Sequence, residues 1–381
     1  MTMATKQAIL KEKLRDYLRA DKAGKGKILD QVEGITGMSR KAVIRRFKGL
    51  QFLDGSKVER RGRKTVYGPM VNAALKEVWL FFEELCAERL QPHLPEYVSL
   101  LLRDGLWPYD RPTTDLLLAM SLGTMKKRLS FLATGKKTKA GLGSTKPSLI
   151  KEIVPIRRGP WENPAPGFGE IDTVAHCGSS LIGDYAYSLQ YTDVATIWTS
   201  LSAQWDKGEK ATLESIKRIR SRLPFSLLGI DSDSGGEFIN WQLSAWCDAQ
   251  GIVFTRTRPY YKNDHGRIEQ KNYVNIRKFL GYVRLGETGK VKLMNELYDC
   301  LEDYINFFLP SMKCLRKERL GSRRKRVYDV PQTAYQRVLN QPNINQEIKD
   351  KLKAKYAILK PKILKEQIGL LIGKILQNAH Y

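Results

Sequence analysis

Three carboxylates stand at the ends of apolar stretches within residues 167–279, and they restrict how this part of the chain can fold. Asp172 interrupts a β-branched stretch with strand character, and Asp231 and Asp233 end a second such stretch. Glu269 lies in a predicted helix that follows a third strand pattern. Two neighbouring strand ends and the flank of a following helix can bring such side chains to one point.

The residue types favour a magnesium site over a zinc site. Hard divalent ions prefer oxygen ligands, and carboxylates are the oxygen ligands that hold Mg²⁺ or Mn²⁺. The chain has four His and five scattered Cys without a C-x-x-C pair, so a His/Cys zinc module is excluded and the cysteines are expected to be reduced thiols. Two ions about 3.5–4 Å apart would activate an attacking oxygen and stabilise the leaving one.

Three motifs carry these carboxylates: Gly169-Glu-Ile-Asp172, Asp233-Ser-Gly-Gly-Glu-Phe238 and His265-Gly-Arg-Ile-Glu-Gln-Lys-Asn272. Their order and spacing resemble the DDE transposases and retroviral-type integrases, whose catalytic core has the ribonuclease H fold. Between Asp233 and Glu269 lie 35 residues, the spacing of the integrase branch, whereas Asp231 would leave 37. We therefore prefer Asp233 to Asp231 as the second ligand, on the spacing alone.

The resemblance implies a function and a set of roles. Asp172, Asp233 and Glu269 would be the catalytic residues and the ligands of two Mg²⁺ ions, with Mn²⁺ as the alternative. The activity would be cutting of double-stranded DNA at an element's 3′ ends, followed by joining of those ends to target DNA by transesterification. Relatives of this kind work as homo-oligomers on paired DNA ends, and the need for a helper ATPase is left open.

The charge balance points to a polyanionic partner. Lys and Arg total 65 against 40 Asp and Glu, which gives a net charge of +25. Such a surface concentrates nucleic acid without regard to sequence. No apolar run reaches the length of a membrane span and the N-terminus lacks a signal-peptide pattern, so we expect a cytoplasmic, nucleoid-associated bacterial protein without a membrane partner.

The predicted fold class is α/β, with a ribonuclease H-like mixed sheet flanked by helices. Three antiparallel strands precede an alternation of helix and strand. Strands are expected at about 167–175, 184–192, 195–203, 225–231 and 252–256, and helices at about 208–222, 238–249 and 264–280. Trp241 and Trp246, on the second of these helices, are expected in the core.

Two helix-turn-helix patterns precede this domain, as in bacterial insertion-sequence transposases. The first spans Ile28–Phe47, with Gly37 closing its first helix, and the second spans Asp115–Phe131. The expected DNA contacts are Arg40, Lys41 and Arg45 in the first and Lys126, Lys127 and Arg128 in the second. The alternative for the first pattern is an ordinary basic helical hairpin.

Further basic residues lie near and after the third carboxylate. Arg267 and Lys271 share a helix face that points away from Glu269, so they would hold flanking DNA rather than the reacting phosphate. Residues 311–326 contain eight basic side chains, among them Arg323 and Arg324, and are expected to form an extended arm on DNA. Two helices, about 344–356 and 361–378, would form a C-terminal tail.

The predicted domains follow from these patterns. They are a helix-turn-helix domain (1–68), a second helical domain (69–134), a basic linker (135–160), the catalytic core (161–285), a helix with the basic arm (286–327) and the helical tail (328–381). One alternative function is a catalytically inactive, sequence-specific DNA-binding regulator derived from a transposase. Another is a ribonuclease H-type nuclease, which the helix-turn-helix patterns disfavour because an A-form hybrid hides the major-groove edges.

Overall fold

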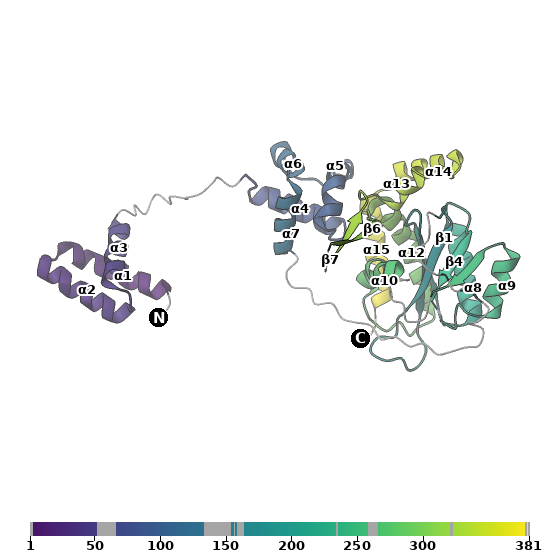
Figure 1. Ribbon diagram of the computed structural model, residues 1–381, viewed down its shortest axis with the longest axis horizontal. Coiled ribbons are helices and arrows are strands. Elements are labelled where there is room, and N and C mark those ends of the chain that lie inside the picture. Colours follow the sequence, from purple (N-terminus) through teal and green to yellow (C-terminus); the bar gives the residue numbers. More distant parts are fainter. Residues whose placement is uncertain are drawn as a thin grey trace. The chain divides into compact units, whose positions relative to one another are not determined.

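The computed structural model describes residues 3–51, 66–132, 154–155, 157, 164–233, 235–257, 266–320, 323–377 and 379. The chain forms two compact units, Met1–Val66 and Tyr67–Tyr381 (Figure 1). Most of the predicted basic linker, 135–160, lies outside the described residues.

The first unit is a bundle of α1 (Met3–Arg19), α2 (Lys22–Thr36) and α3 (Arg40–Gln51). Its small core consists of Leu10, Leu29, Val32, Val43 and Phe47. Gly37 ends α2 in the left-handed conformation, at φ 66°, and its N–H donates to the carbonyl of Glu33 at 2.8 Å. Glycine adopts this conformation without a Cβ penalty, which explains why the turn falls where the sequence predicted it.

The second unit contains a five-stranded sheet in the order β3-β2-β1-β4-β5. Its strands are β1 (Phe168–Ala175), β2 (Tyr187–Asp193), β3 (Thr199–Gln204), β4 (Gly229–Ser232) and β5 (Val253–Arg256). The first three strands are antiparallel neighbours, and β4 and β5 run parallel to β1 and to each other. This mixed sheet flanked by helices is a ribonuclease H-like fold, as the sequence predicted.

Alternation along β1 sends its side chains to two different cores. Ile171 packs with residues of α8 (Glu209–Arg222) and α9 (Trp241–Ala249) on one face. Val174 belongs to the larger core on the other face, which includes α11 (Lys278–Leu280) and α12 (Gly289–Phe308). Asp172 has the parity of Val174, so it lies on the α11 and α12 side.

Side chains of α12 pair with the outer backbone groups of the edge strand β3. Asn306 Oδ1 accepts the N–H of Thr199 at 2.8 Å and its Nδ2 donates to the same residue's carbonyl at 2.7 Å. Asn295 does the same at Ala203, at 2.9 and 3.1 Å. Between them, Glu302 Oε1 accepts the N–H of Leu201 at 2.6 Å. Helical spacing thus matches the alternate residues of the strand.

The opposite edge of the sheet is also covered. On β5, the N–H of Arg256 donates to the carbonyl of Pro155 at 3.0 Å, and the carbonyl of Arg256 accepts the N–H of Arg157 at 2.9 Å. Val154, next to this contact, is buried in the core of the α8 and α9 face. The segment that enters the sheet domain therefore lies along its second edge.

The remaining helices share the larger core. These are α4 (Pro69–Phe81), α5 (Ala87–Arg103), α6 (Arg111–Leu118), α7 (Leu122–Leu132), α13 (Ala334–Leu339), α14 (Gln346–Ile358) and α15 (Pro361–Leu376). Tyr97 on α5 donates to the carbonyl of Phe308 at the end of α12, at 2.8 Å. Tyr335 and Tyr356 stack with ring centroids 4.9 Å apart. Helices from both ends of the unit therefore pack on α12.

Three local predictions were wrong. The third strand begins at Thr199 rather than 195, because Asp193 Oδ1 holds a turn by accepting the N–H and Oγ1 of Thr196, both at 2.7 Å. Trp241 is 65% exposed rather than in the core, since it stands at the start of α9. Most of the basic arm forms a hairpin of β6 (Cys314–Leu320) and β7 (Arg323–Tyr328). Within the described ranges, no helix is long and apolar enough to span a membrane.

Glu302 makes the stability of this unit depend on pH. Burial raises the pKa of Glu302 to about 6 from an ordinary 4.5, against the lowering effect of Arg222. The folded chain therefore binds more protons than the unfolded chain between these values, so the free energy of unfolding falls as pH rises through about 4.5–6. We expect this carboxyl to account for a fall of roughly 2 kcal/mol.

Urea unfolding of the full chain and of Glu302→Gln across this pH range measures the effect. The other titrating groups are common to both proteins, so the difference between the two pH profiles isolates Glu302. Parallel profiles would contradict the raised pKa.

Candidate active site

The pairing of two parallel strands sets the backbone positions near Asp172 and Asp233. The register of β1 with β4 pairs Glu170 with Asp231 and Ile171 with Ser232. Asp172 is the next residue on β1, and Asp233 directly follows Ser232, the last residue of β4. Both are half-buried, whereas Asp231 is fully buried.

Asp231 occupies a different environment from Asp233. Its Oδ2 lies 2.8 Å from Nη2 of Arg157, and its Oδ1 accepts a hydrogen bond from Thr255 Oγ1 at 2.6 Å. A fully buried carboxylate with a guanidinium partner holds structure together and is closed to an outside ion. Asp233 instead accepts the N–H of Gly235 at 2.9 Å, within the turn that follows β4.

The helix that carries the third carboxylate reaches Asp172 through Asn272. Glu269 and Asn272 both lie on α10 (Gly266–Asn272), one turn apart and therefore on one face. Asn272 Nδ2 donates to Asp172 Oδ2 at 2.7 Å. The side chain of Glu269 is outside the described part of the structure, but its helix position is one turn before the residue that contacts Asp172.

A π-helical segment, η2 (Tyr273–Arg277), continues α10. Within it, the buried Asn275 donates to Gln190 Oε1 at 3.1 Å, and Gln190 is the β2 partner of Asp172. Wider turns of this kind recur at functional sites. Two asparagines, Asn272 and Asn275, thus join the helix to the sheet beside Asp172.

Glu237 is a carboxylate that the sequence did not mark as a site residue. It is 5% exposed, accepts from Thr173 Oγ1 at 3.0 Å and lies 2.8 Å from Lys207 Nζ. A Cβ added to Gly235 would stand 2.5 Å from Glu237 Oε2 and 2.8 Å from Asp233 Oδ1, so both carboxylates approach this glycine. The sequence did contain a signal for this residue, because Glu237 belongs to the motif Asp233-Ser-Gly-Gly-Glu-Phe238.

The predicted DNA-contacting residues have different surroundings. In the first unit, Arg40, Lys41 and Arg45 are exposed on α3, and Arg40 also pairs with Asp30. On α7, Lys126 and Lys127 are exposed, and Lys126 pairs with Glu88 at 2.8 Å.

Arg128 and Lys271 are less available than the sequence suggested. Arg128 is half-buried, hydrogen-bonds to Asn72 and lies over the ring of Tyr67, with 5.4 Å between its Cζ and the ring centroid. Burial, together with the charges of Arg89 and Arg337, lowers the pKa of Lys271 to about 8. Arg323 and Arg324 lie on β7, and the side chains of Arg267, Arg323 and Arg324 are outside the described part of the structure.

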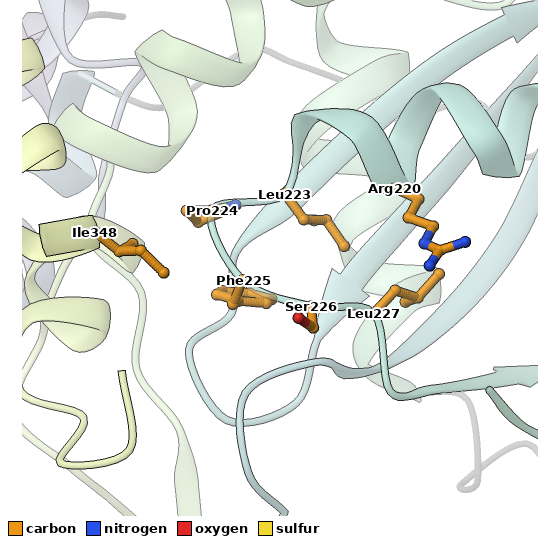
Figure 2. Close-up of a pocket in the computed structure, with 7 residues that line it drawn as sticks. All are labelled: Arg220, Leu223, Pro224, Phe225, Ser226, Leu227 and Ile348. Atoms are coloured by element: carbon orange, nitrogen blue, oxygen red, sulfur yellow. The ribbon is translucent and has the colours of Figure 1, made fainter. Parts of the chain in front are cut away.

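The donor set fits a hard divalent cation. Asp172 on β1 and Asp233 directly after β4 carry carboxylate oxygens, the ligands that such ions prefer, and Glu269 lies one turn before Asn272 on α10. Among the side chains that the structure describes, no three His, Cys, Asp or Glu groups come together, and Glu269 is not among them. The pocket in Figure 2 is a separate feature, because Leu223 to Leu227 lead into the opposite end of β4.

No family model matches the sequence. Over 336 residues, the chain is 33% identical to uncharacterized protein y4rM of Sinorhizobium fredii (strain NBRC 101917 / NGR234). The aligned region spans 87% of this chain and 94% of that protein. The chain belongs to the y4rM family.

Two solved structures are similar to parts of this y4rM-family chain. One is the catalytic core domain of HTLV-2 integrase in complex with magnesium; the match spans 39% of this chain and 93% of the integrase chain, at 15% identity and a TM-score of 0.30. The other is the catalytic core domain of BIV integrase; the match spans 50% of this chain and 98% of the integrase chain, at 14% identity and a TM-score of 0.30. The fold assignment rests on strand order and register instead.

The ion pair of Arg157 and Asp231 is expected to stabilise the sheet edge. Arg157→Met removes the guanidinium that faces a fully buried carboxylate, and the free energy of unfolding should fall by roughly 3–5 kcal/mol. In the double variant Arg157→Met/Asp231→Asn, the side chain at position 231 is uncharged, so part of the lost free energy of unfolding should be regained. Urea unfolding of both variants measures this, and a double variant no more stable than the single one would contradict it.

Proposed function

We propose that this chain is a metal-dependent DNA strand transferase of the transposase and integrase type. One arrangement carries the proposal: Asp172 lies on β1 beside β4, Asp233 directly follows β4, and Asn272, one turn after Glu269, hydrogen-bonds to Asp172. The fold, the order of the motifs and the 35-residue spacing between Asp233 and Glu269 support it. The strongly basic composition suits a DNA substrate.

In the proposed mechanism, Asp172, Asp233 and Glu269 hold divalent cations, with Asp231 assigned to structure. Bound Mg²⁺ or Mn²⁺ would supply activation of the attacking oxygen and stabilisation of the leaving oxygen. The chain itself positions the DNA, so that water and then the freed 3′-OH lie in line with the phosphorus. Asn272 holds α10 against β1, and the Glu237–Thr173 contact holds the turn after β4 against the same strand.

The finer proposal is a bacterial insertion-sequence transposase. Exposed basic residues on α3 and α7 would contact the element's ends, and a homo-oligomer would hold two ends together. The expected partner is double-stranded DNA, with the need for a helper ATPase left to experiment. Conversion into an inactive DNA-binding regulator is one outcome of the test below.

The test uses labelled duplex DNA that carries the sequences flanking the gene, with Mg²⁺ or with EDTA. Wild-type protein should nick and join this DNA only with Mg²⁺, and Asp172→Asn, Asp233→Asn and Glu269→Gln should each abolish joining while DNA binding persists. Asp248→Asn, an exposed carboxylate on α9, is the matched control and should remain active.

Activity in any of the three variants would remove that residue from the site. Specific binding to the flanking DNA without metal-dependent nicking, even with neighbouring gene products added, would establish the regulator instead.

Asn272 is expected to act as a positioning residue. Because it donates to Asp172, Asn272→Ala should weaken Mn²⁺ binding and lower the turnover rate by about 10–100-fold, as losses of outer-shell partners do. Asn272→Gln should restore little, since its longer side chain cannot keep the 2.7 Å contact without a shift of α10. Titration calorimetry with Mn²⁺ measures the affinity, and an unchanged affinity would argue against this role.

A further inference from the structure

The β6–β7 ribbon, residues Cys314–Tyr328, divides its basic residues between two faces. The register pairs Lys317 with Arg326 and Arg319 with Arg324. The alternate pairs, Arg316 with Val327, Glu318 with Lys325 and Leu320 with Arg323, belong to the other face. We call the face formed by positions 317, 319, 324 and 326 the cationic face.

On the cationic face, the backbone register puts basic positions opposite each other on the two strands. Such cross-strand pairs destabilise a ribbon, whereas opposite charges stabilise it. On the other face, Glu318 is opposite Lys325 and lies 2.6 Å from Nε of Arg316, so acidic and basic groups alternate there. The arrangement on the cationic face gains stability when an anionic partner lies against it.

The base of the ribbon is fixed to the sheet domain. Asp329 accepts the N–H of Lys313 at 2.6 Å and pairs with Arg337 at 2.6 Å. Arg337 is 5% exposed and also donates to the carbonyl of Ser311 at 2.8 Å. Lys313 Nζ donates to the carbonyl of Ala195, in the turn between β2 and β3, at 2.8 Å. A buried clamp therefore sets where the ribbon leaves the domain.

Most of the described side chains of the ribbon are exposed to solvent. Arg319, Lys325 and Arg326 are exposed, and Tyr328, which has the parity of Arg326 on β7, is 43% exposed. A two-stranded ribbon has the width that the major groove of B-DNA admits, and basic side chains on it reach the phosphates that border the groove.

We propose that the cationic face of the β6–β7 ribbon binds duplex DNA through the phosphates that border one groove. The proposal rests on the proposed function in taking DNA as the partner. It separates two neighbours that the sequence treated alike, because Arg324 lies on the cationic face and Arg323 on the other. Because the base of the ribbon is fixed and the ribbon has the width of the major groove, the contact with DNA would have a defined position.

The experiment compares two double variants of the full chain with equal loss of charge. Arg319→Gln/Arg324→Gln alters the cationic face, and Arg316→Gln/Arg323→Gln alters the other face. Affinity for a labelled 30-base-pair duplex of arbitrary sequence is measured by fluorescence anisotropy from about 50 to 300 mM NaCl in EDTA. Each lost phosphate contact lowers the slope of log affinity against log salt by about 0.9.

We expect the cationic-face variant to lower the slope by about 1.8 and the control variant by less than half of that. Loss on a single strand of the same sequence should be smaller than on the duplex. Equal slopes for the two variants, an unchanged slope for the cationic-face variant, or equal losses on both substrates would overturn the proposal.

Two further readouts separate the possible failures. Thermal unfolding of both double variants shows whether each keeps its fold, so a slope difference between two variants of equal stability reports contact with DNA rather than loss of structure. Binding is measured without metal, so it does not depend on Asp172, Asp233 or Glu269 being catalytic. If the two double variants differ in slope as expected but the wild-type chain performs no strand transfer, only the proposed function is refuted.

Discussion

Covered strand edges are the constraint on which this sheet domain depends. An edge strand exposes a row of backbone donors and acceptors that attract other strands. Here Asn295, Glu302 and Asn306 supply matching groups to β3 from one stripe of α12, and Arg218 Nη1 completes the set at the carbonyl of Leu201, at 3.4 Å. Because α12 also carries the larger core, the same helix joins the sheet to the helices on either side of it in sequence.

With its edges held, the sheet can serve as a rigid frame for side chains that approach from different elements. The pairing of β1 with β4 sets the backbone around Asp172 and the turn that carries Asp233, and the asparagines of α10 and η2 hold the helix against β1 and β2. Asp231, of similar sequence context, is instead buried in an ion pair with Arg157. Burial and choice of partner therefore give neighbouring acidic residues different surroundings.

Local patterns predicted most elements of the sheet domain, because alternation and strand-ending glycines are short-range signals. Asp233 was preferred to Asp231 by spacing, and the burial of Asp231 is a long-range fact that supports the same choice. The sequence could not supply contacts between distant residues: Glu237 with Thr173, Asn272 with Asp172, and Arg128 over the ring of Tyr67. The hairpin within the basic arm was missed because charge density hid the alternation of residues.

Gly235 separates two effects that a substitution usually combines. Its missing side chain leaves room for two carboxylates, because an added Cβ would stand 2.8 Å from Asp233 Oδ1 and 2.5 Å from Glu237 Oε2. Both of these contacts are with side-chain ends, so alanine at this position would shift the two carboxylates before it disturbed the backbone. Position 235 can therefore change the placement of two acidic groups while the sheet, its covered edges and the larger core stay as they are.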